Sequence, residues 1–352
     1  FGGLVSFVMF LFLSGASAFF GYVKYDGTEH GPQIVRRRSK ILVRSLLILG
    51  GYYLVAIVAS IPELTFPPTH ETWVMLIKIL TFQVFPPFTE FILAFVLFNL
   101  LLLVLRPVLR FLVKTPILLL LVGGALYLAG YMLWQVDVSE PLLSYKALLA
   151  GHEAIHTFPL LQFAIIYLLG LSWGSFLFNH PDSDIRFKVS SYVLIATSLL
   201  VVAGGITFSY LGFDWIDPLL RFPPSITMMA IGLATSYGFW FVLQLTNNGK
   251  LLGPLQVLLH YMGTKAFDFF IIHTIILFAY KYVTKDQHHD SIFVVIGLFL
   301  LLLLLTFIAT AVMEGVIKNL KESSESESEY GWILSEKLIV NVIWVVLIVV
   351  TG

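Results

Sequence analysis

Long apolar stretches separated by short polar ones dominate the chain. A helix that crosses a bilayer needs roughly 20 apolar residues. We therefore expect transmembrane helices near 3–22, 41–61, 86–105, 116–135, 158–177, 189–210, 225–245, 266–283, 291–313 and 338–351. The pattern predicts an all-α polytopic integral membrane protein, with about ten transmembrane helices in one bundle.

The polar segments between these stretches are too short to build a core of their own. Residues 1–352 are therefore predicted to form a single transmembrane helical domain. Within it, residues 321–330 carry an alternating run of serine and glutamate. Such a low-complexity run predicts a flexible acidic loop between the last two spans.

Basic residues divide unevenly between the two sides of the predicted membrane. Of the 21 Lys and Arg residues, one side carries only Lys78, Lys146, Arg221, Lys281 and Lys285. Cytoplasmic loops are enriched in Lys and Arg, so the basic loops are predicted to be cytoplasmic and residue 1 to lie outside. Because residue 1 is Phe rather than Met, we expect a further helix or a cleaved signal segment before it.

The composition is that of a membrane protein: 58% of residues are hydrophobic, 12% are charged, and the mean hydropathy is +0.91. The net charge is zero, and nothing in the sequence predicts a nucleic-acid partner. The absence of cysteine excludes disulfides, iron–sulfur clusters and thiolate catalysis. The expected surroundings are the lipid bilayer, with membrane-protein partners or a homodimer left open.

Few ionisable or strongly polar side chains fall inside the predicted spans, among them Glu90, Gln162, Asp268 and His273. A charged group at the centre of a membrane helix costs about 2.5–3.5 kcal/mol on insertion scales, so each of these residues needs a reason. One interpretation is a functional role, and the other is packing against a backbone carbonyl or a neighbouring helix. Asp268 and His273 are separated by roughly 140° around a helix and are not expected to form a pair on one face.

The stretch His152-Glu153-Ala154-Ile155-His156 fits the H-E-x-x-H pattern of zinc proteases. It lies in a predicted outer loop, and no third ligand follows at a suitable spacing, so a metal site is not favoured. We expect instead a turn that leads into the fifth span. A third interpretation is that His152 or His156 lines a polar outer cavity and handles substrate protons.

Basic residues cluster at the start of the second span, where Arg36, Arg37 and Arg38 are followed by Lys40. The plainest interpretation is that they hold the loop at anionic headgroups. Three adjacent arginines also favour capture of phosphate, because a guanidinium group presents two donors to two oxygens. The two roles are compatible, and a pyrophosphate-bearing donor would suit the second.

Two blocks of the sequence match the pattern of a known family. The stretch Phe10–Ser17, followed by Arg36–Arg38, resembles an "FFxLSG … RR" opening. The stretch Phe158–Phe163, which runs into Gly170 and Gly174, is similar to an "FPLLPW … G … G" helix.

A third block, Leu258–Ala266 with Phe270–His273, resembles a late "LxxLGxxSLxxYxxH" segment. Together the three blocks resemble the acyltransferase-3-like superfamily of multi-pass membrane acyltransferases, in its heparan-glucosaminide acetyltransferase-like and YeiB-like branches. Family members also carry an arginine and a histidine on the helix before the "LSG" span, which would lie upstream of Phe1. Gln162 stands where a tryptophan-containing pair is common, and Phe267-Asp268 replaces the usual Ser-Leu.

The resemblance implies an enzyme that moves an acyl group from cytoplasmic acyl-CoA to a hydroxyl or amino group of a sugar or lipid outside. Arg36, Arg37, Arg38 and Lys40 would approach the CoA phosphates. His273 would be the late histidine of the family and a candidate base, with Glu90 as the other candidate. The predicted substrate-binding residues are His152, His156, Gln162 and Asp268. Two alternatives remain: a non-catalytic accessory membrane subunit with the same fold, and a transporter that uses Asp268, His273 and Glu90 as a proton path.

Overall fold

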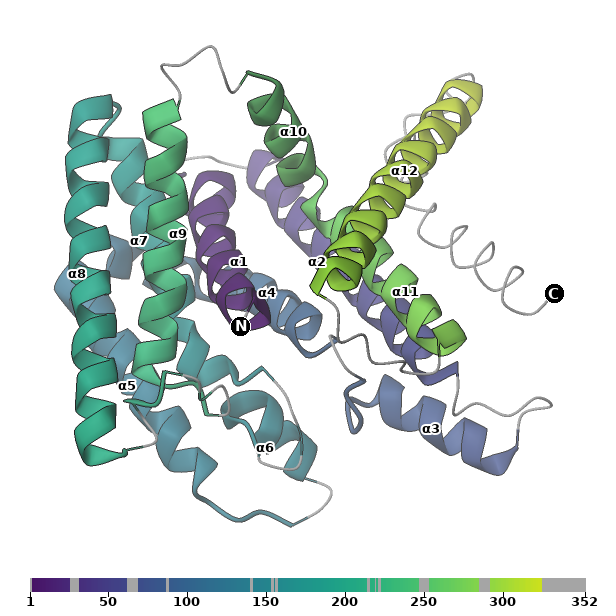
Figure 1. The fold of residues 1–352 in the computed structure, drawn as a ribbon, viewed down its shortest axis with the longest axis horizontal. Coiled ribbons are helices and arrows are strands. Elements are labelled where there is room, and N and C mark those ends of the chain that lie inside the picture. The colour runs from purple at the N-terminus through teal and green to yellow at the C-terminus, as the bar shows by residue number, and fades with distance from the viewer. Residues whose placement is uncertain are drawn as a thin grey trace. The chain divides into compact units, whose positions relative to one another are not determined.

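A computed structural model of the chain describes residues 2–25, 32–61, 69–86, 89–139, 142–152, 155, 158–213, 216–218, 220, 223–246, 253–284 and 292–324 (Figure 1). These residues form helices and no strand. The elements are α1 (Gly2–Ala18), the π-helical η1 (Phe19–Val23), α2 (Pro32–Ser60), α3 (His70–Leu80), α4 (Glu90–Lys114), α5 (Pro116–Trp134), α6 (Leu143–Ala150), α7 (Leu160–Asn179), α8 (Ser183–Leu211), α9 (Ile226–Thr246), α10 (Gly253–Thr264), α11 (Ala266–Thr284) and α12 (Ile292–Ser324).

Eight helical segments in the described part of the chain are long and apolar enough to cross a membrane. They are Ser6–Val23, Val35–Ser60, Glu90–Lys114, Pro116–Trp134, Leu160–Asn179, Ser183–Leu211, Ile226–Gln244 and Phe293–Gly315. Each overlaps one of the stretches that hydropathy predicts, so the prediction of an all-α polytopic membrane protein is confirmed. The stretch 266–283 forms α11, which is helical but not among the eight, and 338–351 lies outside the described residues. The number ten therefore stays a prediction.

The packing divides the chain into two compact units. Unit 1 comprises Phe1–Ser45 and Leu93–Gly253, and unit 2 comprises Leu46–Ile92 and Pro254–Gly352. The prediction of a single domain does not anticipate this division, and each unit is described by itself below. The predicted acidic loop 321–330 begins inside α12, which continues to Ser324, and the rest of that loop lies outside the described residues.

Helix α7 is the central element of unit 1. It packs against α1 and against α5, while α1 also contacts α9, and α9 lies along α8 (Figure 1). Half of the α7 side chains are buried, and Phe163, Ile166 and Leu171 are almost inaccessible to solvent. A membrane helix surrounded by other helices is expected to be apolar on all sides, as α7 is.

Glycines allow α1 and α7 to approach until their backbones touch. A Cβ atom at Gly170 would overlap the carbonyl oxygen of Phe12, and one at Gly15 would overlap the carbonyl oxygen of Tyr167. A Cβ at Gly174 would come within 2.7 Å of the Ala16 carbonyl oxygen. Small residues four apart are the usual means of close helix packing in membranes, where the hydrophobic effect does not drive helices together.

Unit 2 contains the second part of α2, together with α3, α10, α11 and α12. Gly51 of α2 gives room to α11, because a Cβ at this position would lie 2.8 Å from the ring of Phe267. Three aromatic rings, one each from α10, α11 and α12, pack against one another. Those of Tyr261 and Phe307 have centroids 5.3 Å apart, and those of Phe269 and Phe307 have centroids 5.5 Å apart.

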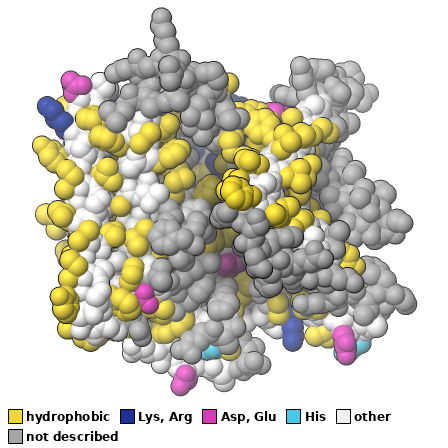
Figure 2. All heavy atoms as spheres, viewed as in Figure 1, with side chains coloured by type: hydrophobic (Ala, Val, Ile, Leu, Met, Phe, Trp, Pro, Cys, Tyr) yellow, Lys and Arg dark blue, Asp and Glu magenta, His cyan; other side chains and the backbone are white. Residues whose placement is uncertain are grey.

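Large apolar side chains lie exposed along whole helices rather than singly. On the face shown in Figure 2 they cover α8 and α12. Exposed examples from these two helices are Ile195, Leu199, Val202, Ile206, Phe293, Phe299, Leu300 and Leu304. Apolar surface of this extent is what acyl chains of a bilayer cover, which agrees with the assignment of both helices as spans.

Candidate functional site

The first transmembrane helix ends in a short π-helix that no sequence pattern predicts. Helix α1 changes at Phe19 to the wider η1, which continues to Val23 and closes with a hydrogen bond from the Lys24 amide to the Phe19 carbonyl, 3.0 Å long. π-Helical turns are rare and occur often at functional sites. Here the turn brings Tyr22, Lys24 and Tyr25 to the end of the helix, where they meet side chains from α2 and α4.

Tyr25 is the point at which the basic residues converge. The guanidinium carbon of Arg37, on α2, lies 3.1 Å from the centre of the Tyr25 ring. Arg106, on α4, donates a hydrogen bond from Nη2 to the Tyr25 carbonyl oxygen over 2.7 Å. The ammonium group of Lys24 lies 5.0 Å from the same ring centre. Three cations from three parts of unit 1 thus surround one tyrosine.

A second tyrosine completes the group. The guanidinium of Arg106 also lies over the Tyr22 ring, with its central carbon 4.6 Å from the ring centre. Tyr22 is 1% exposed, and its hydroxyl has no hydrogen-bond partner among the described residues. A buried hydroxyl without a partner is uncommon. Tyr22, Lys24, Tyr25, Arg37 and Arg106 are called the cation–aromatic cluster below.

Electrostatics favour an anion in the cation–aromatic cluster. Within the described ranges, neither Lys24 nor Arg106 forms an ion pair with a carboxylate. The negative faces of the aromatic rings offset part of the repulsion between neighbouring cations, by about 0.5–2 kcal/mol for each contact. A phosphate group would offset more of it, since guanidinium groups bind phosphate with two parallel hydrogen bonds.

The basic residues that the sequence singles out lie beside this cluster in unequal environments. Arg36, Arg38 and Lys40 are exposed on α2, whereas Arg37 is half-buried against Tyr25. Sequence analysis missed Lys24 and Arg106 as site residues. One signal could have found them: both stand at the ends of predicted spans, on the same side as the three arginines.

The two predicted bases, His273 and Glu90, belong to unit 2. Nδ1 of the His273 ring lies 3.0 Å from the Phe269 carbonyl oxygen. Because a carbonyl oxygen only accepts, Nδ1 is the donor in this hydrogen bond. The neutral ring therefore carries its lone pair on Nε2. Glu90 is buried as the first residue of α4, where a carboxylate is favoured by the helix dipole. Phe91 and Phe270 connect their helices, with ring centroids 4.3 Å apart.

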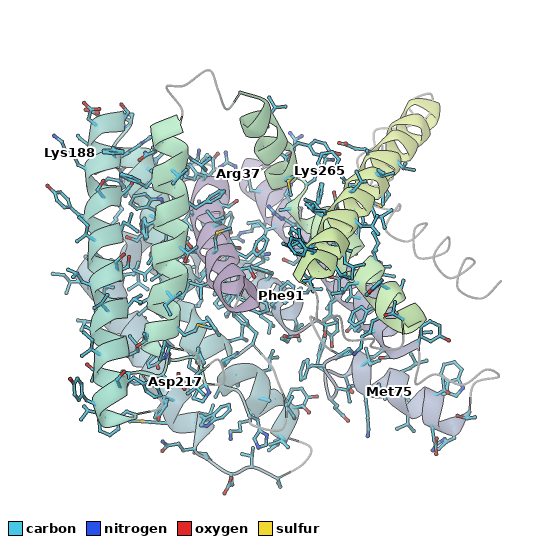
Figure 3. The ribbon with its side chains drawn as sticks, viewed as in Figure 1. Arg37, Met75, Phe91, Lys188, Asp217 and Lys265 are labelled. Carbon is cyan, nitrogen blue, oxygen red and sulfur yellow. The ribbon has the colours of Figure 1, made fainter. Side chains whose placement is uncertain are left out.

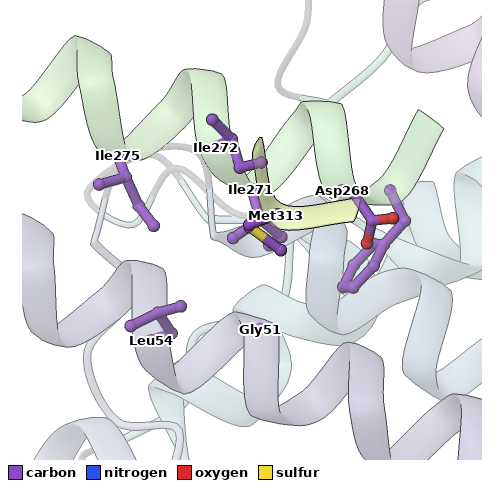
Figure 4. A pocket seen from close by; sticks show the side chains of 8 residues that line it. Gly51, Leu54, Asp268, Ile271, Ile272, Ile275 and Met313 are labelled. Atoms are coloured by element: carbon purple, nitrogen blue, oxygen red, sulfur yellow. The ribbon is translucent and has the colours of Figure 1, made fainter. Parts of the chain in front are cut away.

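Asp268 lies at one end of a small pocket in unit 2 (Figure 4). The pocket encloses about 30 Å³, enough for a water molecule, and its other walls are apolar. They come from α2, α11 and α12 and consist of Gly51, Leu54, Phe267, Ile271, Ile272, Ile275 and Met313. His273 is not among these residues.

Next to this pocket, α10, α11 and α12 share a polar group of side chains. Lys265 forms an ion pair with Glu314 over 2.9 Å, and the Tyr261 hydroxyl donates a hydrogen bond to the same carboxylate over 2.9 Å. Desolvation and the hydrogen bond to Glu314 raise the pKa of Tyr261 above its ordinary value. The contacts attach α12, at Glu314, to the junction of α10 and α11.

Gln162, a predicted substrate-binding residue, is fully buried in unit 1. Its Nε2 donates a hydrogen bond to the Ala150 carbonyl oxygen over 2.7 Å, and so holds the last turn of α6. Lys146 does the same for α5, with Nζ donating to the Trp134 carbonyl oxygen over 2.7 Å. The Nε2 contact agrees with the packing interpretation of Gln162, whereas its Oε1 is buried and has no hydrogen-bond partner among the described residues.

The H-E-x-x-H stretch is described only in part. Helix α6 ends at Ala150, and His152 forms an isolated bridge with Ile155. His152 is therefore not helical, so a helical pair of histidines does not begin there. Glu153, Ala154 and His156 lie outside the described residues.

Comparison with known proteins adds no relative to this picture: the chain matches no family model, no characterised protein and no solved structure. A function is therefore inferred from the geometry of the chain itself. The two units contribute different groups: the cation–aromatic cluster and Gln162 lie in unit 1, and His273, Glu90 and Asp268 lie in unit 2.

Proposed function

We propose that the chain is a membrane-embedded acyltransferase. It takes an acyl group from cytoplasmic acyl-CoA and passes it to a hydroxyl or amino group of a sugar or lipid on the outer side. The observation that carries the proposal is the convergence of Lys24, Arg37 and Arg106 on Tyr22 and Tyr25. The proposal rests in addition on the polytopic helical architecture, which offers an apolar medium for an acyl chain.

The chemistry of CoA suits the cation–aromatic cluster. CoA carries a diphosphate, a further phosphate on the ribose and an adenine ring. Lys24 and Arg106 would bind phosphate oxygens. Arg36, Arg38 and Lys40 are exposed nearby on α2 and would attract the anion from solution.

The proposed orientation places this end of unit 1 in the cytoplasm. Figure 3 shows Arg37 and Lys188 toward one end of unit 1 and Asp217 toward the other. Arg37 and Lys188 at one end agree with the excess of Lys and Arg that marks cytoplasmic loops.

In the proposed reaction His273 is the general base. Its Nε2 takes the proton from the acceptor hydroxyl or amine, whose oxygen or nitrogen attacks the thioester carbonyl carbon. The carbon–sulfur bond then breaks, and the CoA thiolate leaves with the proton that the imidazolium returns. The contact between Nδ1 and the Phe269 carbonyl oxygen supports this role, because a neutral ring that donates from Nδ1 has its acceptor lone pair on Nε2.

The experiment is a calorimetric titration of the purified full chain, in lipid nanodiscs, with acetyl-CoA. Lys24→Gln and Arg106→Gln are each expected to weaken binding about tenfold or more, because each removes a charge-assisted hydrogen bond worth about 1.5–3 kcal/mol. Lys188→Gln is the matched control, since Lys188 is an exposed cation on α8, at the same end of unit 1 as Arg37 (Figure 3).

The control should bind acetyl-CoA as the unmodified chain does. Equal affinity for all four proteins would contradict a phosphate site at the cation–aromatic cluster. Absence of binding to the unmodified chain would contradict the acyltransferase proposal altogether.

A proton-coupled transporter is the second candidate, and Asp268 is the observation that favours it. An ionisable carboxylate beside a water-sized cavity with apolar walls is a common arrangement in proton paths. Titrations without any acetyl-CoA binding would make this function the better of the two.

A further inference from the structure

Helix α3 is too short to cross a bilayer, with 11 residues from His70 to Leu80. Its start is fixed by Thr69, whose hydroxyl accepts a hydrogen bond from the Thr72 amide over 3.4 Å. It lies between the spans Val35–Ser60 and Glu90–Lys114 in the sequence. Hydropathy alone leaves this segment as part of a loop.

The end of α3 is attached to α2 by aromatic contacts. The Tyr53 hydroxyl donates a hydrogen bond to the Leu80 carbonyl oxygen over 3.2 Å. The Phe82 ring stacks on Tyr53 with centroids 6.0 Å apart and also contacts Tyr52, at 5.6 Å. Phe82 has a φ of 56°, a left-handed conformation that costs a bulky residue free energy. The contacts with Tyr52 and Tyr53 hold it there.

This attachment sets the level of α3 relative to the membrane. Tyr53 belongs to the span Val35–Ser60 and precedes its end by about two helical turns, or roughly 10 Å. With the end of this span taken as the boundary of the bilayer, the C-terminal end of α3 lies at the depth of the lipid headgroups and the first acyl carbons, where interfacial helices lie.

The surface of α3 has three distinct sides. Thr72 and Ile79 are buried. A second side is apolar and yet exposed: Trp73, Ile77 and Leu80 are 57%, 56% and 55% exposed and follow the spacing of one helical face.

The third side is polar and carries the exposed Glu71 and Lys78. These two residues are roughly 100–160° around the helix from the apolar side. The exposed surface is thus itself divided into an apolar and a charged half.

We propose that α3 is an interfacial helix that inserts Trp73, Ile77 and Leu80 into the headgroup–acyl boundary of the bilayer and keeps Glu71 and Lys78 in water. We take lipid as the occupant of the apolar side, because Tyr53 attaches α3 to a membrane span near the end of that span. Tryptophan is the side chain most favoured at this boundary. The inference does not depend on the acyltransferase proposal.

The chain of residues 1–352 contains no cysteine, so single cysteines can be introduced into it without removing others. Trp73→Cys and Ile77→Cys probe the apolar side, and Glu71→Cys and Lys78→Cys are the matched controls on the polar side. Each variant is labelled with a nitroxide and placed in phosphatidylcholine bilayers. Collision with oxygen, which concentrates in lipid, is compared with collision with a water-soluble nickel chelate.

The ratio of oxygen to nickel collisions should be several-fold higher at 73 and 77 than at 71 and 78. Equal ratios with strong nickel collisions at all four positions would show that α3 lies in water and would overturn the proposal. Labels at 73 and 77 that neither reagent reaches would also overturn it, because protein would then cover that side. Circular dichroism and gel filtration verify that each variant is folded.

Discussion

Replacing Gly170 with leucine is expected to destroy the packing between α1 and α7. Overpacking of a core typically costs about 1–3 kcal/mol, and occasionally more. Here the clash is with the carbonyl oxygen of Phe12, and backbone atoms cannot move aside as the end of a side chain can. We therefore expect a loss of about 3 kcal/mol or more, measured as a large drop in the thermal midpoint of the purified protein and in its yield.

Gly124→Leu is the matched control for this change. Gly124 also belongs to a membrane span, but nothing lies within 4 Å of a Cβ built on it. The control should retain the thermal midpoint of the unmodified chain within a few degrees. Equal midpoints for Gly170→Leu and the unmodified chain would show that α1 and α7 are not in backbone contact.

Replacing His273 with glutamine is expected to lower acyl transfer by about 10²–10⁴-fold, the usual contribution of a general base. Acetyl-CoA binding should be unchanged, because the phosphate site proposed here does not include His273. Transfer is followed as thiol released from acetyl-CoA with glucosamine or phosphatidylethanolamine as acceptor. A thiol reagent reports only the released CoA, since the chain has no cysteine.

His260→Gln is the control, because His260 is an exposed histidine on the neighbouring α10. It should transfer acyl groups at the rate of the unmodified chain. A His273→Gln variant with full activity would remove His273 from the mechanism, and Glu90 would become the base to test.

Hydropathy predicted the spanning helices well. Lipid offers the backbone no hydrogen-bond partners, so an apolar segment that crosses it satisfies its own backbone groups by forming a helix. The position of Arg37 illustrates the limit of this reasoning. Its place in a basic run can be read from the sequence, but its stacking on Tyr25 depends on η1 and on the spacing between α1 and α2. Nothing in the five residues Phe19–Val23 distinguishes a π-helix from an α-helix.

Contacts between distant segments explain the other residues that sequence reasoning missed. Lys24 and Arg106 are 82 positions apart in numbering but meet at Tyr22 and Tyr25. Helix α3 was missed for a different reason. Its period is helical but its length falls below that of a span, so hydropathy assigns it to a loop.

Gln162 shows that polarity within a span is ambiguous. Its place in the sequence is compatible with two interpretations, ligand binding and helix packing. Only the contact with the Ala150 carbonyl, which closes α6, favours packing. Buried amides commonly satisfy helix ends in this way.

Photo-crosslinking with an acyl-CoA that carries an azide on its adenine ring tests the central claim most directly. The labelled peptides of the full chain in nanodiscs are identified by mass spectrometry, with and without excess CoA. The account predicts CoA-sensitive labelling of peptides that contain Tyr22–Tyr25, Arg36–Lys40 or Arg106. Labelling confined to other parts of the chain, or labelling that excess CoA does not reduce, would contradict it.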